Sequence, residues 1–455
     1  MRITVFGGAG EIGGNQILLE GKETKILLDF GRSFARESLY FDEPYLSARK
    51  PEHLYSLHLL PDIEGIYPWE EIEPSISGIF ISHAHLDHMD YIRYVKESIP
   101  IYVGEGTWKI ITARDATGKS SKYQLAKFNE KLSDSPQRCI VPCRGFTIQP
   151  FRTGRELSVD EFKIKPVHVD HSAPAAYGFI IDGPEGRVVY TGDIRFHGYK
   201  RSFSEEFLRM AENPDVLITE GTNLVGFKPS SEEEVGRKLG DIIEKTSGLV
   251  AASFSPVDID RMKTFFNVAK RSGRKFIISM KQAMLIDVLS DEIRQRLLDF
   301  PFTLGDENVL IYEREKEKTY KWEEKMIERY EVVDSSWVSE HQQEVLLFAT
   351  YYDMLEMLTI KPEVGSVFIY SESEPWNEEG EFEFEKLENW LETLGMPLVH
   401  IHASGHASPF DLKRMIETLS PRKIIMVHSE RPEIFKKFAN VENMICPQQG
   451  VPIEL

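Results

Sequence analysis

The stretch that decides the fold is ISHAHLDHMD, residues 81–90. It continues an apolar, β-branched run, which predicts a buried strand followed by a turn. Four side chains that bind metals, His83, His85, Asp87 and His88, lie within this short stretch. Imidazole and carboxylate are the ligands of zinc and similar divalent metals. Positions i and i+2 of an extended segment project to one side, so His83 and His85 can bind one ion, and the turn lets Asp87 and His88 reach a second.

The other candidate ligands lie far from this stretch in the sequence. Most of the thirteen histidines gather in four places, each where an expected strand gives way to a turn. Asp193, in VVYTGD, also ends an expected strand, and its carboxylate is suited to bridging two ions. These residues are therefore predicted to join the 81–90 stretch in one site. The histidines concerned are His168, His171, His197, His400, His402, His406 and His428.

Composition restricts the class of protein. The 455 residues have room for two or three domains, and the 41% of hydrophobic residues can form a large core. Only three cysteines are present, which predicts a reducing compartment, the cytoplasm, and no disulfide framework. No apolar run reaches the roughly 20 residues that span a bilayer, so no membrane association is expected. The net charge of −19 argues against general polyanion binding, so a nucleic-acid enzyme would need a local basic groove.

Two styles of sequence alternate along the chain. Short strands dominate up to about residue 220, interrupted by a Pro- and Glu-rich segment at 33–72 that is expected to be a surface excursion. From about residue 223, helices and strands alternate, which predicts a parallel sheet covered by helices. From about residue 398 the strand-rich style returns. In the middle part, strands are expected at 248–255, 275–279 and 364–371, and helices at 230–246, 261–273, 280–289, 313–330 and 345–350.

These motifs resemble two known patterns in their usual order. The HxHxDH stretch, His171, Asp193 in TGD and Asp29 in LLDFG resemble the metallo-β-lactamase fold. The later motifs ITEGTN (218–223), HASGHAS (402–408) and MVHSE (426–430) are similar to those of the β-CASP nucleases, particularly ribonuclease J and its archaeal relatives. The opening GGAGEIGGN and the closing QQGVPIEL are similar as well, so the resemblance covers nearly the whole chain.

The resemblance implies an α/β protein of discontinuous architecture. A metallo-β-lactamase domain, an αβ/βα sandwich with a dinuclear site, would comprise residues 1–222 and 396–455. An inserted α/β domain of the β-CASP type would occupy residues 223–395. The change in sequence style near both boundaries agrees with this division.

The resemblance also assigns roles to single residues. Two divalent ions are implied, zinc first and manganese as the alternative. The ligands of one would be His83, His85 and His171, those of the other Asp87, His88 and His428, with Asp193 bridging and Asp29 orienting a ligand histidine. Asp87 and Asp193 would also take part in catalysis, with His406 as general acid and Glu220 as its orienting carboxylate. His402, Ser404 and Gly405 would bind phosphate. Arg261 lies in SPVDIDRM (255–262), where the sequence departs from the family, and either a nucleic-acid contact or a surface salt bridge is expected there.

The function implied is hydrolysis of single-stranded RNA by hydroxide attack at a two-metal site. The 5′-to-3′ exonuclease mode is favoured, endonuclease action is the variant, and a homodimer is the expected assembly. Two departures, Ala175 in place of an acid and Ser429 in place of glycine, bear on polarity and assembly rather than on the metal site. Two other hypotheses remain open: a small phosphodiester or thioester hydrolase on the same site, and a catalytically silent RNA-processing subunit.

Two local patterns have competing explanations. Gly8, Gly10 and Gly13 spell the dinucleotide-binding G-x-G-x-x-G, but a helix would have to begin at the third glycine. The residues that follow predict a hairpin instead, so the glycines are expected to form a tight turn beside the metal site. The basic cluster KRSGRK (270–275) is expected to be a solvated helix end, with contact to an RNA backbone as the alternative.

Overall fold

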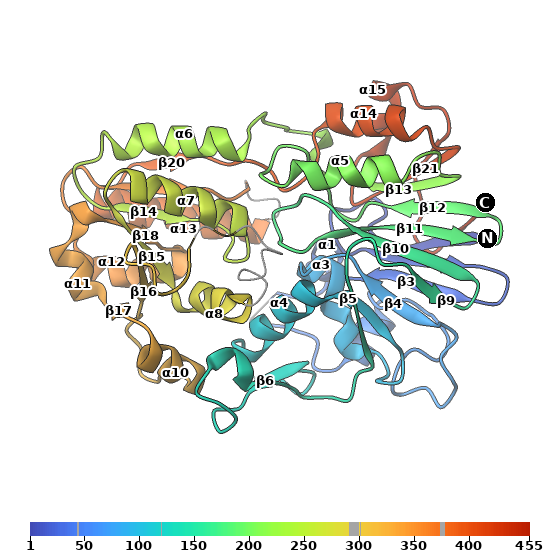
Figure 1. Cartoon of the computed structure of the whole chain (residues 1–455), viewed down its shortest axis with the longest axis horizontal. Coiled ribbons are helices and arrows are strands. Elements are labelled where there is room, and N and C mark those ends of the chain that lie inside the picture. The colour runs from blue at the N-terminus through green and yellow to red at the C-terminus, as the bar shows by residue number, and fades with distance from the viewer. Residues whose placement is uncertain (43–44, 120, 291–299, 301, 374–377) are drawn as a thin grey trace.

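The structure is a computed structural model that describes residues 1–455 except 43–44, 120, 291–299, 301 and 374–377. Two seven-stranded sheets form one half of the molecule, on the right in Figure 1. The first sheet has the order β23 (Pro452–Glu454), β1 (Arg2–Gly7), β2 (Gln16–Glu20), β3 (Lys25–Phe30), β4 (Gly78–Ile81), β5 (Ile101–Gly104), β8 (Ile148–Phe151). The second has the order β22 (Met444–Ile445), β21 (Lys423–Val427), β13 (Val216–Glu220), β12 (Gly186–Tyr190), β11 (Tyr177–Gly183), β10 (Phe162–His168), β9 (Leu157–Val159).

These two sheets pack face to face, with helices on both outer faces. Apolar side chains from both sheets, among them Ile3, Phe80, Phe179 and Ile218, form the buried layer between them. The first sheet is covered by α2 (Pro51–Ser56), α3 (Leu86–Met89) and α4 (Glu105–Ala116). The second is covered by α5 (Arg201–Met210), α14 (Pro409–Leu419) and α15 (Pro432–Ala439). The predicted αβ/βα sandwich is confirmed.

A third sheet of seven parallel strands forms the other half of the molecule (Figure 1). It is inserted between β13 and β21, which are neighbours in the second sheet. Its order is β17 (Val332–Val333), β16 (Val309–Tyr312), β15 (Lys275–Ser279), β18 (Val345–Phe348), β14 (Val250–Ser253), β19 (Val367–Tyr370), β20 (Leu398–His400). One face packs on α6 (Glu232–Ile243), α7 (Ile259–Arg271), α8 (Met280–Val288) and α10 (Lys321–Arg329), the other on α11 (Ser335–Glu340), α12 (Met354–Ile360) and α13 (Glu378–Leu394).

Local sequence explains most of these elements, and three expectations need correction. The Ser231 hydroxyl caps α6 and the Asp258 carboxylate caps α7, each accepting a hydrogen bond from the backbone three residues on. The helix expected at 345–350 is instead the buried central strand β18, because a short apolar run fits either element. The helix expected at 313–330 begins only at Lys321. The segment at 33–72, which holds α1 (Phe34–Glu37) and α2, is no surface excursion, because its apolar side chains join the core below the first sheet.

The two halves meet along helices and a crossing strand. Helix α8, which packs on the third sheet, lies against α4. The side chains of Ile259 and Leu285 join the hydrophobic core below the first sheet. Strand β20 pairs with β19, so the third sheet extends just beyond the division predicted at residue 395. The domain boundaries stay a prediction. Within the described residues, every helix is too short or too polar to cross a membrane.

A buried histidine makes the fold sensitive to acid. His168 lies against the rings of Tyr177 and Phe203, and burial lowers its pKa to about 4. Its pKa in the unfolded chain is near 6.5, so the unfolded state takes up a proton first as the pH falls, and stability is lost between these two values. We expect the wild type to lose about 2 kcal/mol more unfolding free energy between pH 7 and pH 5 than His168→Phe does. Urea denaturation at both pH values measures the difference, and equal losses would contradict the assignment.

Candidate metal centre

Most of the predicted site residues converge where strands of the first two sheets end. His168, His197 and His400 do not join them in the metal-binding groups found among the described residues. His83 and His85 follow β4, Asp193 follows β12, and His428 follows β21. Asp29 lies near the end of β3. Carboxyl ends of parallel neighbouring strands lie at the same edge of a sheet, and packing the two sheets face to face brings both edges together. The structure therefore places residues from distant parts of the sequence in one cluster.

One group of donors contains His83, His85, His171 and Asp193, whose donor atoms all lie within 4.8 Å of one another. His85 Nδ1 lies 3.1 Å from His83 Nε2 and 3.1 Å from His171 Nε2. The Asp193 Oδ2 atom lies 3.5 Å from His83 Nε2 and 3.8 Å from His171 Nε2. Ligand atoms 2.0–2.1 Å from a tetrahedral zinc ion are about 3.3–3.4 Å apart, so this spacing suits one shared ion.

A second group contains Asp87, His88 and His428, again within 4.8 Å of one another. Asp87 Oδ2 lies 3.2 Å from His428 Nε2 and 3.9 Å from His88 Nε2. Asp193 Oδ2 lies 3.2 Å from His88 Nε2 and 3.7 Å from His428 Nε2. Asp193 is thus the carboxylate between the two groups, as a bridging residue would be.

Hydrogen bonds on the outer ring nitrogens fix the tautomers of these histidines. His88 Nδ1 donates to Asp29 Oδ2 at 2.7 Å, and His171 Nδ1 donates to the Gly405 carbonyl at 2.6 Å. His428 Nδ1 lies 2.8 Å from the Thr222 hydroxyl. His88 and His171 therefore present the lone pair of Nε2 to the centre, the arrangement typical of metal-bound histidine.

Unpaired buried atoms and local charge both fit a bound cation. His88 Nε2 and both Asp193 oxygens are buried without a hydrogen-bond partner among the described residues. His88 Nε2 and Asp193 Oδ2 face each other at 3.2 Å outside hydrogen-bonding geometry, and a bound cation would satisfy both atoms. Burial lowers the pKa of His83 and His171 well below the ordinary value, which keeps them neutral donors. Burial would also lower the pKa of His88, but the surrounding carboxylates raise it well above the ordinary value, which shows a local need for positive charge.

Asp29 is held by a set of donors that the sequence did not reveal. Its carboxylate accepts from the Ser82 backbone N–H and hydroxyl and from the Tyr190 hydroxyl, each at 2.7 Å. Asn15 in turn donates to the Tyr190 oxygen at 2.9 Å. Asp29 has a φ of 58°, a left-handed conformation that persists only where such contacts enforce it. Asn15 lies within the GGAGEIGGN motif, but nothing local indicated Tyr190.

The glycine-rich turn lies beside the centre, as predicted. Gly13 has a φ of 80°, and a Cβ atom there would lie 2.6 Å from Asp87 Oδ2. The Gly8 carbonyl accepts from the His428 backbone N–H at 2.8 Å. The chain after Gly14 continues as strand β2, so the dinucleotide-binding explanation is excluded.

His406 and Glu220 lie together next to Asp193. His406 Nδ1 lies 3.1 Å from Glu220 Oε2 and 3.8 Å from Asp193 Oδ2. Burial would lower the pKa of His406, but Glu220 and Asp193 raise it to about 9, so the ring carries a proton at neutral pH. The Thr222 hydroxyl lies 3.2 Å from His406 Nδ1 and links it to His428. Thr222 was missed, although it lies within the quoted ITEGTN motif.

Buried arginines hold residues 402–405 in place through hydrogen bonds to the backbone. Arg195 Nη1 donates to the Ser404 carbonyl at 3.3 Å, and Arg261 Nη2 donates to the Ala403 carbonyl at 2.9 Å. His402 Nδ1 lies 3.2 Å from the Ser371 carbonyl, and Asn223 donates to the Ser404 hydroxyl at 3.0 Å. These contacts orient the segment, while its predicted phosphate binding stays a prediction.

The prediction that Arg261 contacts nucleic acid is wrong. Its side chain is fully buried, and it donates to Glu232 at 3.0 and 3.2 Å and to the Ser371 carbonyl at 2.5 Å. The alternative, a surface salt bridge, is wrong in its location, because Arg261 pairs with Glu232 in the interior, where both side chains are fully buried. Arg195 extends this network between the two halves, at 3.1 Å from Asp170 and 2.7 Å from Asp260.

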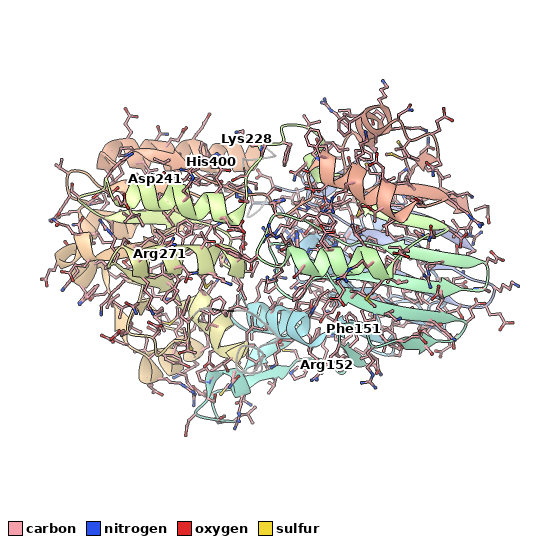
Figure 2. All side chains as sticks on the ribbon, turned by 45° about the horizontal axis from the view of Figure 1, so that its top comes forward. Phe151, Arg152, Lys228, Asp241, Arg271 and His400 are labelled. Atoms are coloured by element: carbon pink, nitrogen blue, oxygen red, sulfur yellow. The ribbon has the colours of Figure 1, made fainter. Side chains whose placement is uncertain are left out.

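The basic cluster at 270–275 also has a structural role. Arg274 donates to the backbone carbonyls of Gly248 and Val345 at 3.0 Å, and Lys270 lies 3.7 Å from Asp306. Arg271, at the end of α7, lies in the half of the molecule formed by the third sheet (Figure 2). The expectation of a helix end, rather than an RNA contact, agrees with these positions.

Comparison with known proteins agrees with this geometry. Residues 64–230 match the Beta-lactamase superfamily domain, and residues 396–439 match the Zn-dependent metallo-hydrolase RNA specificity domain. Ribonuclease J of Mycoplasma genitalium is 25% identical, with all of this chain aligned to 71% of that protein. Ribonuclease J of Helicobacter pylori is 23% identical, with 99% of this chain aligned to 59% of that protein.

The chain is similar to ribonuclease J, and its matched regions support a metal-dependent hydrolase. The two matched regions contain every predicted ligand, Glu220 and His406, and leave out Asp29 and Arg261. A crystal structure of a protein of unknown function from Enterococcus faecalis has the same fold, with a TM-score of 0.74, 21% identity and alignment over 100% of this chain and 99% of that one. This ribonuclease J-like chain spans 59–71% of the length of the two curated relatives named above.

Proposed function

We propose that this protein hydrolyses phosphodiester bonds of RNA at a centre of two divalent metal ions. The observation that carries the proposal is the pair of donor groups that share Asp193, with the protonated His406 beside them. The RNA specificity domain that matches residues 396–439, and the two ribonuclease J relatives, support RNA as the substrate. Histidine and carboxylate donors suit zinc, which we propose as the metal, with manganese as the alternative.

Hydrolysis needs an activated water, a stabilised phosphate and a proton for the leaving oxygen, and different groups of the site would supply these. Two bound divalent ions would supply Lewis acidity, which activates water and neutralises charge on the phosphate. His406 donates a proton to the leaving 3′ oxygen, and Glu220 holds the ring and keeps it protonated. Asp29 orients His88 through the 2.7 Å hydrogen bond and raises its basicity.

Replacing His406 with alanine tests the acid role. We expect RNA cleavage to fall about a hundredfold with bound metal retained, because a general acid contributes about that factor or more. Hydrolysis of bis(p-nitrophenyl) phosphate should change little, because p-nitrophenolate leaves without a proton. His53→Ala, an exposed histidine on α2, is the matched control. Equal losses on both substrates, or loss of metal from His406→Ala, would show that His406 binds metal instead.

We also propose that cleavage proceeds from the 5′ end, with His402, Ser404 and Gly405 binding the terminal phosphate. Two 3′-labelled RNAs, one with a 5′-monophosphate and one with a blocked 5′ end, test this. Release of mononucleotides only from the first supports the exonuclease mode, and equal fragmentation of both indicates an endonuclease. Cleavage of bis(p-nitrophenyl) phosphate but of neither RNA favours the small-substrate hydrolase. A homodimer and a cytoplasmic location stay predictions.

A further inference from the structure

A cavity of about 840 Å³ opens at the carboxyl edge of the third sheet, and the proposed reaction does not use it. The residues that end five of its strands line this cavity: Ser253, Ser279, Tyr312, Phe348 and Tyr370. Open α/β sheets bind their ligands at this edge, and the volume lies within the range of ligand sites. We call it the sheet-edge cavity.

The sheet-edge cavity is walled by aromatic rings that remain accessible. Tyr320 is 53% exposed and Tyr352 is 66% exposed, although both line the cavity. Tyr351 lies next to them, with its ring centroid 5.4 Å from that of Tyr352. Exposed rings in a concave wall offer π faces on which nucleobases of any sequence can stack.

Some charged side chains in the cavity wall form ion pairs and others do not. Arg314 pairs with Asp353 and Lys316 pairs with Glu323, so these charges are compensated. Lys281 and Lys119 also line the cavity, and neither forms an ion pair with the described residues. Glu313, Glu372 and Glu383 also line the cavity, so attraction for phosphates is confined to the exposed positions Lys119 and Lys281.

The inner wall offers polar groups suited to a base rather than to a phosphate. The Ser253 hydroxyl is buried without a hydrogen-bond partner among the described residues. It lies near the Glu372 carboxyl, outside hydrogen-bonding geometry. Carboxylates repel a phosphate from this depth, whereas the edge of a base can hydrogen-bond to both groups.

The cavity wall is joined to the metal centre through the 402–406 segment. The Ser371 carbonyl, directly after β19, lies 3.2 Å from His402 Nδ1, and the Glu372 carbonyl lies 2.9 Å from His400 Nε2. Three residues after His402, the Gly405 carbonyl accepts from His171. The cavity wall therefore adjoins the segment that borders the metal centre.

We propose that the sheet-edge cavity binds nucleobases of the RNA strand at a distance from the bond that is cut. The bases stack on Tyr320 and Tyr352, and Lys281 and Lys119 contact the adjoining phosphates. This inference rests on the proposed function and adds a second contact for the same substrate. It predicts that the enzyme distinguishes long RNA from short RNA.

The double variant Tyr352→Ala, Lys281→Ala tests the proposal at exposed positions, where folding is not at risk. We expect KM to rise about tenfold for an RNA of about twenty nucleotides and to stay unchanged for one of about four. Hydrolysis of bis(p-nitrophenyl) phosphate should also stay unchanged. The control is Tyr45→Ala, Lys318→Ala, which removes an exposed tyrosine and an exposed lysine outside the cavity. Identical KM values for the double variant and the control would overturn the proposal.

Photocrosslinking gives a readout that does not depend on cleavage. RNA carrying 5-bromouridine is irradiated with the metal-loaded His406→Ala protein, and the linked peptides are mapped. Crosslinks to peptides that contain Tyr320 or Tyr352 support the cavity, and crosslinks confined to other peptides contradict it. If such crosslinks form but the wild type does not cut RNA, the proposed function fails and the binding site stands. If the wild type cuts RNA without them, only the binding site fails.

Discussion

Replacing Asp193 with asparagine is expected to remove bound metal and to lower hydrolysis of RNA and of bis(p-nitrophenyl) phosphate by about a thousandfold or more. Asp193 Oδ2 lies 3.2–3.8 Å from Nε2 of the four histidines that surround it, His83, His88, His171 and His428. A neutral amide in this position removes the one charge that both donor groups share. Each divalent ion contributes several kcal/mol to stabilising the transition state, so losing both costs at least that factor.

The Asp193 side chain is ionised although it is buried. Burial would raise the pKa of its carboxyl, but His428, His88 and His406 lower it well below the ordinary value. The centre therefore holds an ionised carboxylate in a buried place, and asparagine cannot reproduce it. Metal content by mass spectrometry and rates on both substrates measure the effect. Asp182→Asn, a half-exposed carboxylate paired with Arg187 at 2.7 Å, is the matched control. Full metal content in Asp193→Asn would contradict the bridging role.

Local pattern was sufficient to locate the centre. The donor residues of the 81–90 stretch and those that follow other strands appear along the chain in the order of the family that it resembles. Packing two sheets face to face brings the ends of their strands together. The same logic predicted the parallel sheet of the inserted segment. It failed at 345–350, because an apolar run of six residues fits a buried strand and a helix equally.

Partners that are distant in the sequence explain the other misses. Arg261 is separated by 29 residues from Glu232 and by 110 from Ser371, so nothing near it indicates that it is buried. Tyr190 reaches Asp29 across 161 residues, from the opposite sheet. Such contacts depend on how the sheets and the inserted segment pack, which no single stretch encodes.

The buried network around Arg261 leads to the second large effect, on stability. Burial would raise the pKa of Glu232, but Arg261 and Arg195 lower it to about 2, so its carboxylate is charged in the interior. Arg261→Met leaves this charge without its main partner, and we expect unfolding free energy to fall by about 3–5 kcal/mol. Urea denaturation measures the loss. Arg237→Met is the matched control, because the exposed ion pair of Arg237 with Asp241 on α6 contributes about 0.5 kcal/mol or less.

A second substitution separates loss of an ion pair from loss of packing. In Arg261→Met, Glu232→Gln the stranded charge is gone, so part of the lost stability should return, and the double-mutant cycle gives the coupling energy. The network also supports the 403–404 carbonyls, so Arg261→Met should lower kcat at temperatures where the variant is fully folded. An arginine that contacted RNA would instead raise KM and leave stability unchanged. Unchanged unfolding free energy in Arg261→Met would therefore contradict the internal role that its burial and hydrogen bonds assign to it.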